Sequence, residues 1–256
     1  MNCTCSQLPT VTSSDGKCTV SGYNFSINNG SPLTSLYPAS SPWVTAVGAT
    51  QFSDQTNGLC GQQFNAGGKT IDCEIGEIVS SIATGAAITS GGGFSTISRA
   101  QGYQTNAVQQ YLQSGVLLPP SSFYNASLRA YPDVAFSGHN WLISYSENTT
   151  ESCPCGFFPV DGTSCSSPGF AGVVSSLNHQ LQLHNRPVLG FFNPLLYQMG
   201  ESFPQTFQDI NVGDNYCTET LCSDKIGYRS AIGWDPVSGL GTPNFVNILD
   251  YLLNLD

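Results

Sequence analysis

The sequence has few charged side chains. Asp, Glu, Lys and Arg make up 9% of its 256 residues, with seven Lys and Arg against seventeen Asp and Glu. The formal net charge of −10 argues against nucleic acid as a partner, because affinity for a phosphate backbone comes from clustered Lys and Arg. The same balance is compatible with an acidic compartment, where protonation of carboxylates would relieve self-repulsion.

The sequence also lacks an apolar stretch long enough to span a bilayer, so it predicts no membrane partner. Its first residues, Met-Asn-Cys-Thr-Cys, have neither the basic start nor the apolar run of a signal peptide. Ten cysteines and five glycosylation sequons nevertheless favour an oxidising lumen, the sequons lying at Asn2, Asn24, Asn29, Asn125 and Asn148. We therefore expect a lysosomal, other acidic lumenal or secreted glycoprotein, of which this sequence is a fragment.

The cysteines show no zinc-site spacing, because the two Cys-x-Cys pairs are too tight and have no nearby His. Disulfide pairing cannot be deduced from sequence alone, although Cys60 with Cys73 would close a short loop. Cys165 falls within a predicted helix. We expect it to be a buried small residue rather than a disulfide partner.

One stretch predicts a nucleophile. Residues 161–168 read Asp-Gly-Thr-Ser-Cys-Ser-Ser-Pro, and apolar residues then recur at helical spacing at positions 170, 174, 177 and 181. This pattern predicts a turn that delivers Ser164 to the first turn of a helix running to about Leu183. The positive field at a helix N-terminus suits a serine that must build negative charge on a neighbouring oxygen. An ordinary N-cap serine is the alternative interpretation; the α/β-hydrolase elbow is excluded, because Ser166 stands where its second Gly is required.

The remaining pattern alternates strands and helices. Strands are predicted over Trp43–Ala49, Val134–Phe136 and Trp141–Ser144, the last two around a Ser137–Gly138 turn, and a helix over 104–114. Residues 1–42 and 51–78 are expected to be loops and 90–95 a glycine turn, and Thr242-Pro243 is expected to start a final helix. This order predicts an α/β fold with a mostly parallel sheet and helices on both faces.

Near the C-terminus, Asp209 and Asp235 lie in turn-rich sequence. With main-chain carbonyls and water they could supply the oxygen ligands that Ca²⁺ requires. An aspartate that caps a turn is the commoner explanation of such a pattern, and the spacing of an EF-hand loop is absent.

Taken together, the motifs resemble the sedolisin family of serine-carboxyl peptidases, closest to its tripeptidyl-peptidase I type. The matching segments come in family order and are Tyr37–Thr50, Ser90–Ser95, Pro119–Ala135, Asp161–Pro168, Leu189–Tyr197 and Gly233–Phe245. The resemblance implies that residues 1–256 are the C-terminal part of a single subtilisin-like peptidase domain, incomplete at its N-terminal side. It also implies acid hydrolysis of peptide or protein substrates by a Ser-Glu-Asp triad in which Ser164 is the nucleophile.

The resemblance further implies one structural Ca²⁺ ion. Its ligands would be Asp209, Asp235 and the carbonyls of Ile210, Ala231 and Gly233, with Ala231 standing where the family usually has Gly. Arg229 replaces a family cysteine, so at least one disulfide should differ. By analogy, Cys18 would pair with Cys222 or Cys217.

The sequence departs from the family where the triad carboxylates are concerned. Only 36 residues precede Tyr37, and they contain no Glu and a single Asp, Asp15, which is out of register with the family's oxyanion-hole Asp. The triad Glu and Asp are therefore expected upstream of this stretch, which alone should be inactive. Asp133 is expected to be structural, and a histidine-based triad using His139, His179 or His184 is disfavoured.

Two functions therefore remain open. The first is the nucleophile-bearing part of an acid serine peptidase, with exo- or endopeptidase specificity undetermined. The second is a non-catalytic, calcium-stabilised glycoprotein that binds peptides or partners.

Overall fold

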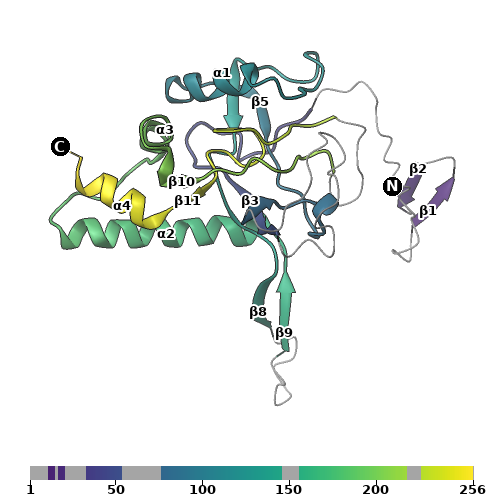
Figure 1. The fold of residues 1–256 in the computed structure, drawn as a ribbon. Helices are drawn as coiled ribbons and strands as arrows, with labels where there is room; N and C mark the ends of the chain where they lie inside the picture. The colour runs from purple at the N-terminus through teal and green to yellow at the C-terminus, as the bar shows by residue number, and fades with distance from the viewer. Residues whose placement is uncertain are drawn as a thin grey trace.

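The fold is built around strand β3 (Val47–Phe52), which pairs in parallel with β7 (Val134–Ser137) and antiparallel with β4 (Glu77–Val79). The computed structural model describes residues 11–14, 17–20, 33–53, 76–145, 156–217 and 226–255. Four successive residues of β3 are buried, as expected for a strand covered on both faces. This parallel pair, together with the helices around it, agrees with the predicted α/β class (Figure 1). The mostly parallel sheet that the sequence predicts is not seen among the described residues, where β3–β7 is the one parallel ladder.

The other ladders of the described residues are antiparallel pairs. These are β1 (Val11–Ser14) with β2 (Lys17–Val20), β5 (Gly93–Arg99) with β6 (Leu128–Tyr131), β8 (Trp141–Tyr145) with β9 (Gly156–Val160), and β10 (Phe207–Gln208) with β11 (Thr242–Pro243). Within the described residues, short 3₁₀ helices connect the elements: η3 (Ile82–Thr84), η4 (Gly102–Gln104) and η5 (Pro204–Thr206).

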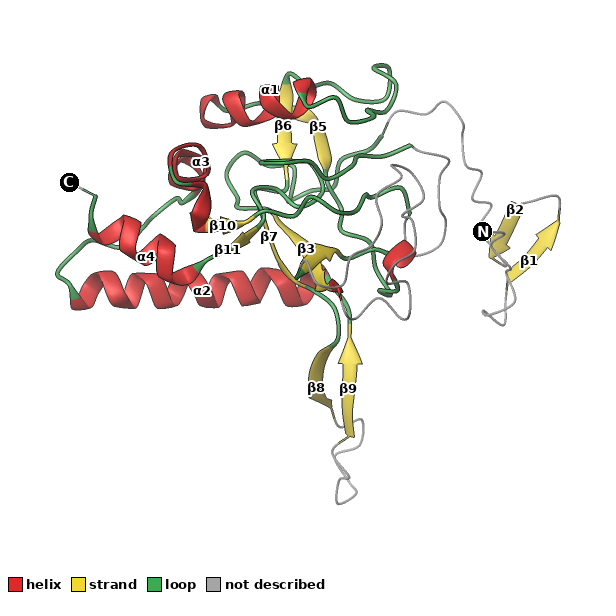
Figure 2. Cartoon of the chain, in the orientation of Figure 1, coloured by secondary structure: helices red, strands yellow, loops and turns green. Residues whose placement is uncertain are grey.

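In the part of the chain that the structure describes, four α-helices surround the strands. They are α1 (Thr105–Gln113), α2 (Thr163–Leu183), α3 (Asn193–Ser202) and α4 (Phe245–Leu253). In the view of Figure 2, α1 lies above β3 and β7, and α2 lies below them. Helix α2 confirms the predicted helix from Ser164 to Leu183, and Phe170, Leu177 and Leu181 on its inner face are buried. Within the described residues, no helix combines the length and apolarity needed to cross a bilayer.

Several predicted boundaries are wrong. The predicted strand at Trp43 starts only at Val47, because Trp43 lies in an exposed turn. The predicted 51–78 loop contains the end of β3 and the start of β4, and residues 54–75 lie outside the described residues. The 1–42 loop contains the β1–β2 hairpin. The predicted glycine turn at 90–95 already opens β5 at Gly93.

Two predicted connections also differ. Strand β8 does not fold back on β7 around Gly138; it pairs with β9 in a hairpin that projects from the body of the molecule (Figure 1). The final helix starts at Phe245 with Asn244 as its cap, because Thr242 and Pro243 are taken up by β11.

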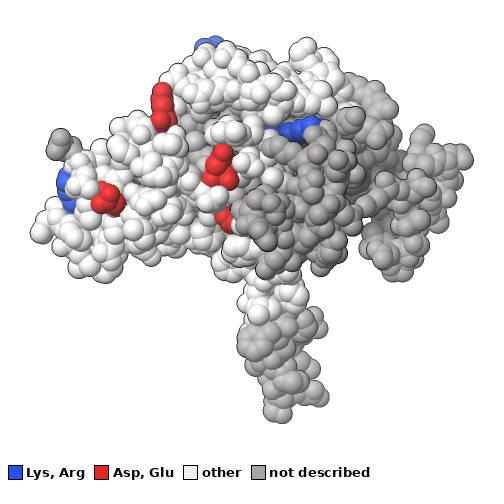
Figure 3. Space-filling view, viewed as in Figure 1, with Lys and Arg blue, Asp and Glu red and all other residues white. Residues whose placement is uncertain are grey.

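The charged side chains that can be seen on one face of the molecule are isolated from one another. On the face shown in Figure 3, the acidic and basic side chains of the described residues are scattered among uncharged ones. This distribution agrees with the low charged content of the sequence.

A buried ion pair joins several elements. Asp133 and Arg129 both have fully buried side chains, and Arg129 Nη2 lies 2.6 Å from Asp133 Oδ2. Asp133 also accepts hydrogen bonds from the Tyr197 hydroxyl (3.0 Å), from the Ala46 N–H (2.8 Å) and from the Asn193 amide (3.3 Å). The carboxylate thus connects the segment before β3, the β6–β7 corner and α3, in the structural role that the sequence predicts.

We predict that Asp133→Ala lowers the free energy of unfolding by about 3–5 kcal/mol, because Arg129 would remain buried without a counter-charge. Urea unfolding of the natural protein that contains this chain measures the loss. Asp250→Ala, at an exposed position of α4, is the control and should change stability little. Equal stability of the two variants would contradict the prediction.

Candidate active site

Ser164 lies in an open groove. The groove has a volume of about 770 Å³, and Ser164 is exposed at its wall in the first turn of α2. We call it the Ser164 groove. Its lining consists of residues 88–92, 161–164, 215–217 and 226–228, together with Leu33, Thr34, Leu36, Ala39, Val47, Phe123 and Tyr131. The sequence-predicted nucleophile is therefore accessible from solvent.

The first turn of α2 has no side-chain cap. Gly162 occupies the cap position with an extended φ of 167°, and its carbonyl accepts the N–H groups of Cys165 (2.9 Å) and Ser166 (3.4 Å). Within the described residues, the N–H groups of Thr163 and Ser164 donate to no acceptor. They supply free donors and a positive field beside the Ser164 hydroxyl, as the sequence predicts.

The turn that carries Ser164 is anchored to the end of β7. The Gly162 N–H donates to the Gly138 carbonyl (2.8 Å), and the Gly138 N–H donates to the Thr50 carbonyl (2.9 Å). A Cβ at Gly138 would lie 2.6 Å from Ser166 Oγ and 2.8 Å from the Ala49 Cβ. These side chains approach the Gly138 backbone so closely that only glycine fits here without displacement.

Asp161 receives three hydrogen bonds. Its Oδ2 accepts the Ala87 N–H (2.6 Å) and lies 2.7 Å from His139 Nδ1, and its Oδ1 accepts the Asn140 N–H (2.8 Å). Partial burial raises the pKa of Asp161, but the donors and His139 outweigh burial, so the pKa is lowered overall. Sequence reasoning missed this pair, because the intervening β8–β9 hairpin separates its members along the chain.

The other histidines do not line the Ser164 groove. His179 is exposed on α2, and His184 is exposed at its C-terminal cap, where its Nδ1 lies 2.8 Å from the Gln180 carbonyl. Cys165 is a free thiol, as predicted, although it is half-buried rather than buried. Asp15, Cys60, Cys73 and Cys222 lie outside the described residues, as does the side chain of Cys18.

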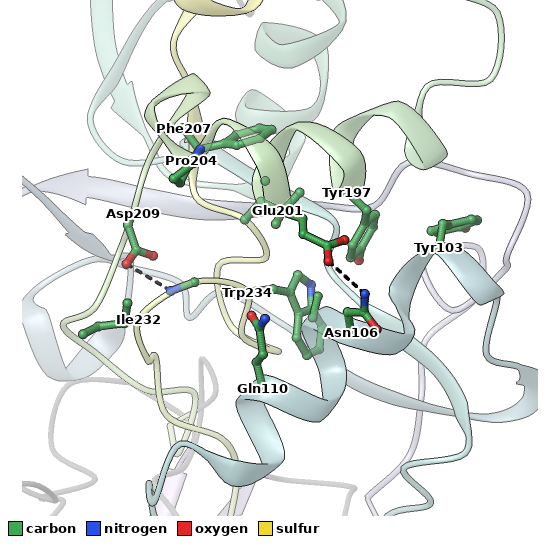
Figure 4. Close-up of a pocket in the computed structure, with 14 residues that line it drawn as sticks. Tyr103, Asn106, Gln110, Tyr197, Glu201, Pro204, Phe207, Asp209, Ile232 and Trp234 are labelled. Carbon is green, nitrogen blue, oxygen red and sulfur yellow. Dashed lines mark hydrogen bonds between the residues drawn. The ribbon is translucent and has the colours of Figure 1, made fainter.

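The predicted calcium ligands converge on one loop. Asp209 Oδ2 accepts the Gly233 N–H (3.1 Å), and Asp235 Oδ2 accepts the Ala231 N–H (3.0 Å). Figure 4 shows Asp209 beside Ile232 at a cavity of about 150 Å³, which Trp234 also lines. The structure therefore brings together both aspartates and the 231–233 loop, as the resemblance implies.

The donor chemistry of this loop fits a hard cation. The carbonyls of Ala231 and Gly233 accept no hydrogen bond from the described residues, and the Ile210 carbonyl accepts only a long one from Ser238 Oγ (3.4 Å). Asp235 is fully buried, and burial raises its pKa to about 7 against the lowering effect of its donors. Two carboxylates and three available carbonyls are the ligand types that Ca²⁺ prefers.

The chain is similar to known peptidases over most of its length. It is 43% identical over 227 residues to physarolisin of Physarum polycephalum, and 40% identical over 225 residues to human tripeptidyl-peptidase 1. These matches cover 88% and 85% of this chain. The chain belongs to the sedolisin family. No family model matches it.

A solved sedolisin shows the same fold. The Pseudomonas sedolisin, a serine-carboxyl proteinase complexed with pseudo-iodotyrostatin, matches with a TM-score of 0.54 and 23% identity over 88% of this chain and 51% of its own. This likeness confirms the predicted subtilisin-like α/β fold. The chain spans only 38% of physarolisin and 33% of human tripeptidyl-peptidase 1.

We predict that Gly138→Ala destabilises this sedolisin chain by about 1–3 kcal/mol, because the added methyl would press on Ser166 and Ala49. Gly172→Ala is the matched control: it adds the same methyl on α2, where nothing lies within 4 Å. Since alanine favours a helix over glycine by about 0.5–1 kcal/mol, the control should gain stability. Urea midpoints that shift in the same direction would refute the close approach.

Proposed function

We propose that this chain supplies the nucleophile of an acid-active serine-carboxyl peptidase, either a tripeptidyl-peptidase or an endopeptidase. One observation carries the proposal: Ser164 is exposed in an open groove at an uncapped helix N-terminus, in a chain 43% identical to physarolisin. The substrate is a peptide or protein. The acidic composition of the chain supports a lysosomal, other acidic lumenal or secreted location.

In the proposed reaction, Ser164 Oγ attacks the carbonyl carbon of the scissile bond. The hydroxyl proton passes to a Glu of the Ser-Glu-Asp triad, which lies outside this chain in the full-length protein. The positive field of α2 favours the negative charge that develops nearby. Collapse of the tetrahedral intermediate breaks the C–N bond and returns the proton to the leaving amine, and water then releases the acyl group by the reverse path.

A glutamate base restricts this chemistry to acid. Since an ordinary Glu titrates near pH 4, its proton affinity matches the task of accepting and returning a proton only in an acidic medium. His139 does not line the Ser164 groove, and its Nε2, the atom that would act as base, is buried with no hydrogen-bond partner among the described residues. The described part of the groove therefore supports a carboxylate-based rather than an imidazole-based mechanism.

We also propose one structural Ca²⁺ ion, held by Asp209 and Asp235 and by the carbonyls of Ile210, Ala231 and Gly233. The ion would neutralise the buried Asp235 carboxylate and connect β10 to the 231–235 loop. It takes no part in bond cleavage.

The first test compares Ser164→Ala with the wild type in the full-length natural protein. We expect peptidase activity at about pH 4 but not at about pH 7 in the wild type. The substitution should lower kcat by on the order of 10⁴-fold or more, because the nucleophile is removed. Ser167→Ala, exposed on the same helix, is the control and should retain activity. A fully active Ser164→Ala protein, or a wild type without peptidase activity, would favour the non-catalytic reading.

The second test addresses calcium. We expect a chelator to lower the unfolding temperature of the wild type. An ion whose free concentration is 100 times its Kd stabilises the folded state by about 2.7 kcal/mol, and the chelator removes this contribution. Asp209→Asn should start at the lower temperature and respond little to the chelator. Asp250→Asn, far from this loop in sequence, should respond as the wild type does. Identical chelator responses in all three proteins would rule out this site.

A further inference from the structure

Asp161 is a carboxylate that the proposed reaction does not use. Its side chain is only 8% exposed and that of His139 only 5%, so both belong to the interior of the site. Asp161 lies three residues before Ser164 in the sequence, yet its hydrogen bonds reach 21, 22 and 74 positions back along the chain. These bonds therefore tie the nucleophile turn to distant segments.

One of these segments is a wall of the Ser164 groove. Ala87, whose N–H donates to Asp161, immediately precedes the groove-lining residues 88–92. Ser90 in that wall is held in turn, because its hydroxyl donates to the Val237 carbonyl (2.7 Å) and accepts the Ala49 N–H (3.0 Å). Asp161 thus fixes the nucleophile turn against a wall that is itself attached to the central sheet.

The other segment is the base of the β8–β9 hairpin. Trp141 pairs with Val160, and the bond from the Asn140 N–H to Asp161 lies directly beyond this pair. The hairpin projects away from the body (Figure 2). On one side, the nucleophile turn continues directly into this projecting hairpin. Without the Asp161 contacts, the turn would be held to the body near Gly138 by the backbone hydrogen bond from the Gly162 N–H to the Gly138 carbonyl.

We propose that Asp161, held by His139, is a positioning residue that sets Ser164 for attack by fixing the turn to the groove wall at Ala87 and to the base of the hairpin. This role rests on the proposed peptidase function. Asp161 and His139 do not touch the substrate in this proposal; they act through the backbone of residues 162–164.

The charge of Asp161 suits this role in acid. The titratable side chains that influence it are His139 and Cys165, and the thiol is neutral because partial burial and the Asp161 charge raise its pKa. Since the pKa of Asp161 is lowered, the carboxylate keeps its charge in an acidic medium and continues to accept all three hydrogen bonds. The Nδ1–H group of His139 can donate whether the ring is neutral or protonated.

The test uses four variants of the full-length natural protein assayed in acid. We expect Asp161→Asn to lower kcat by on the order of 10- to 100-fold, as misplacement of a reacting group does. KM should stay within about twofold, because substrate contacts are untouched. A peptide aldehyde, which adds covalently to a catalytic serine, should lose affinity in parallel with kcat. Asp250→Asn should behave as the wild type.

His139 provides the sharper comparison. The amide of Asn places a donor where His Nδ1 lies, whereas the amide of Gln places one where Nε2 lies. We therefore expect His139→Asn to retain most of kcat and His139→Gln to lose it as Asp161→Asn does. Urea midpoints for all variants separate misfolding from misplacement.

Two outcomes would overturn the proposal: wild-type kcat in Asp161→Asn, or equal kcat in His139→Asn and His139→Gln. If Ser164→Ala abolishes activity while Asp161→Asn does not, the positioning role alone fails. If Ser164→Ala remains active, the proposed function itself fails.

Discussion

The buried Asp133 carboxylate is the constraint on which the arrangement of the site depends. It accepts the N–H of Ala46, the residue before β3, and lies itself immediately before β7. This contact sets the register in which Val47 lies opposite Val134 in the parallel pair. A buried carboxylate tolerates few alternative arrangements, because each lost donor would leave charge unsatisfied in a low-dielectric interior.

The same register places both functional sites. At its far end, β7 leads to Gly138, which accepts the N–H of Gly162 and so locates the turn that carries Ser164. Near Asp133, the Pro132 carbonyl accepts the indole N–H of Trp234 (2.9 Å), and the Asp133 carbonyl accepts the N–H of Leu240 (2.9 Å). The candidate calcium loop is thus packed against one end of β7 and the candidate nucleophile against the other.

The sequence predicts those features whose signal is local. Helix α2 follows from its apolar spacing, and the position of Ser164 follows from the short motif at its start. The Asp161–His139 pair could not be predicted, because its members meet only when the β8–β9 hairpin closes between them. The start of β3 was misplaced for a related reason: residues 43–46 have strand-like composition, but the turn at Trp43 takes the chain out of the sheet. Local pattern thus finds elements, whereas tertiary contacts decide their ends and their partners.

An acidic medium would affect two carboxylates in opposite directions: Asp161, which lines the Ser164 groove, and Asp214, which directly precedes the lining residues 215–217. Burial raises the pKa of Asp214 to about 6 from 3.8, so between these values the folded state binds a proton that the unfolded state lacks. Its contribution to stability therefore falls as pH rises from 3.8 to 6. Asp161 has a lowered pKa, so its contribution is present above the ordinary value and is lost only as pH falls through the lowered one. An acidic medium thus removes the unfavourable charge of Asp214 while it leaves the charge of Asp161 that orders the nucleophile turn.

Arg229 joins two segments of the chain through non-covalent contacts. Its backbone pairs with Asp214, and its Nε donates to the Tyr216 hydroxyl (2.9 Å) with the guanidinium 5.7 Å from the centre of the Tyr216 ring. These contacts join residues 214–216, of which Asn215 and Tyr216 line the Ser164 groove, to the segment that leads into the candidate calcium loop. A disulfide would hold the same two segments at any pH, whereas the arginine holds them through a hydrogen bond and a cation–π contact that solvent can compete for. The Arg229 contacts thus support one part of the groove lining, whereas the nucleophile turn rests on the backbone of β7 and on Asp161.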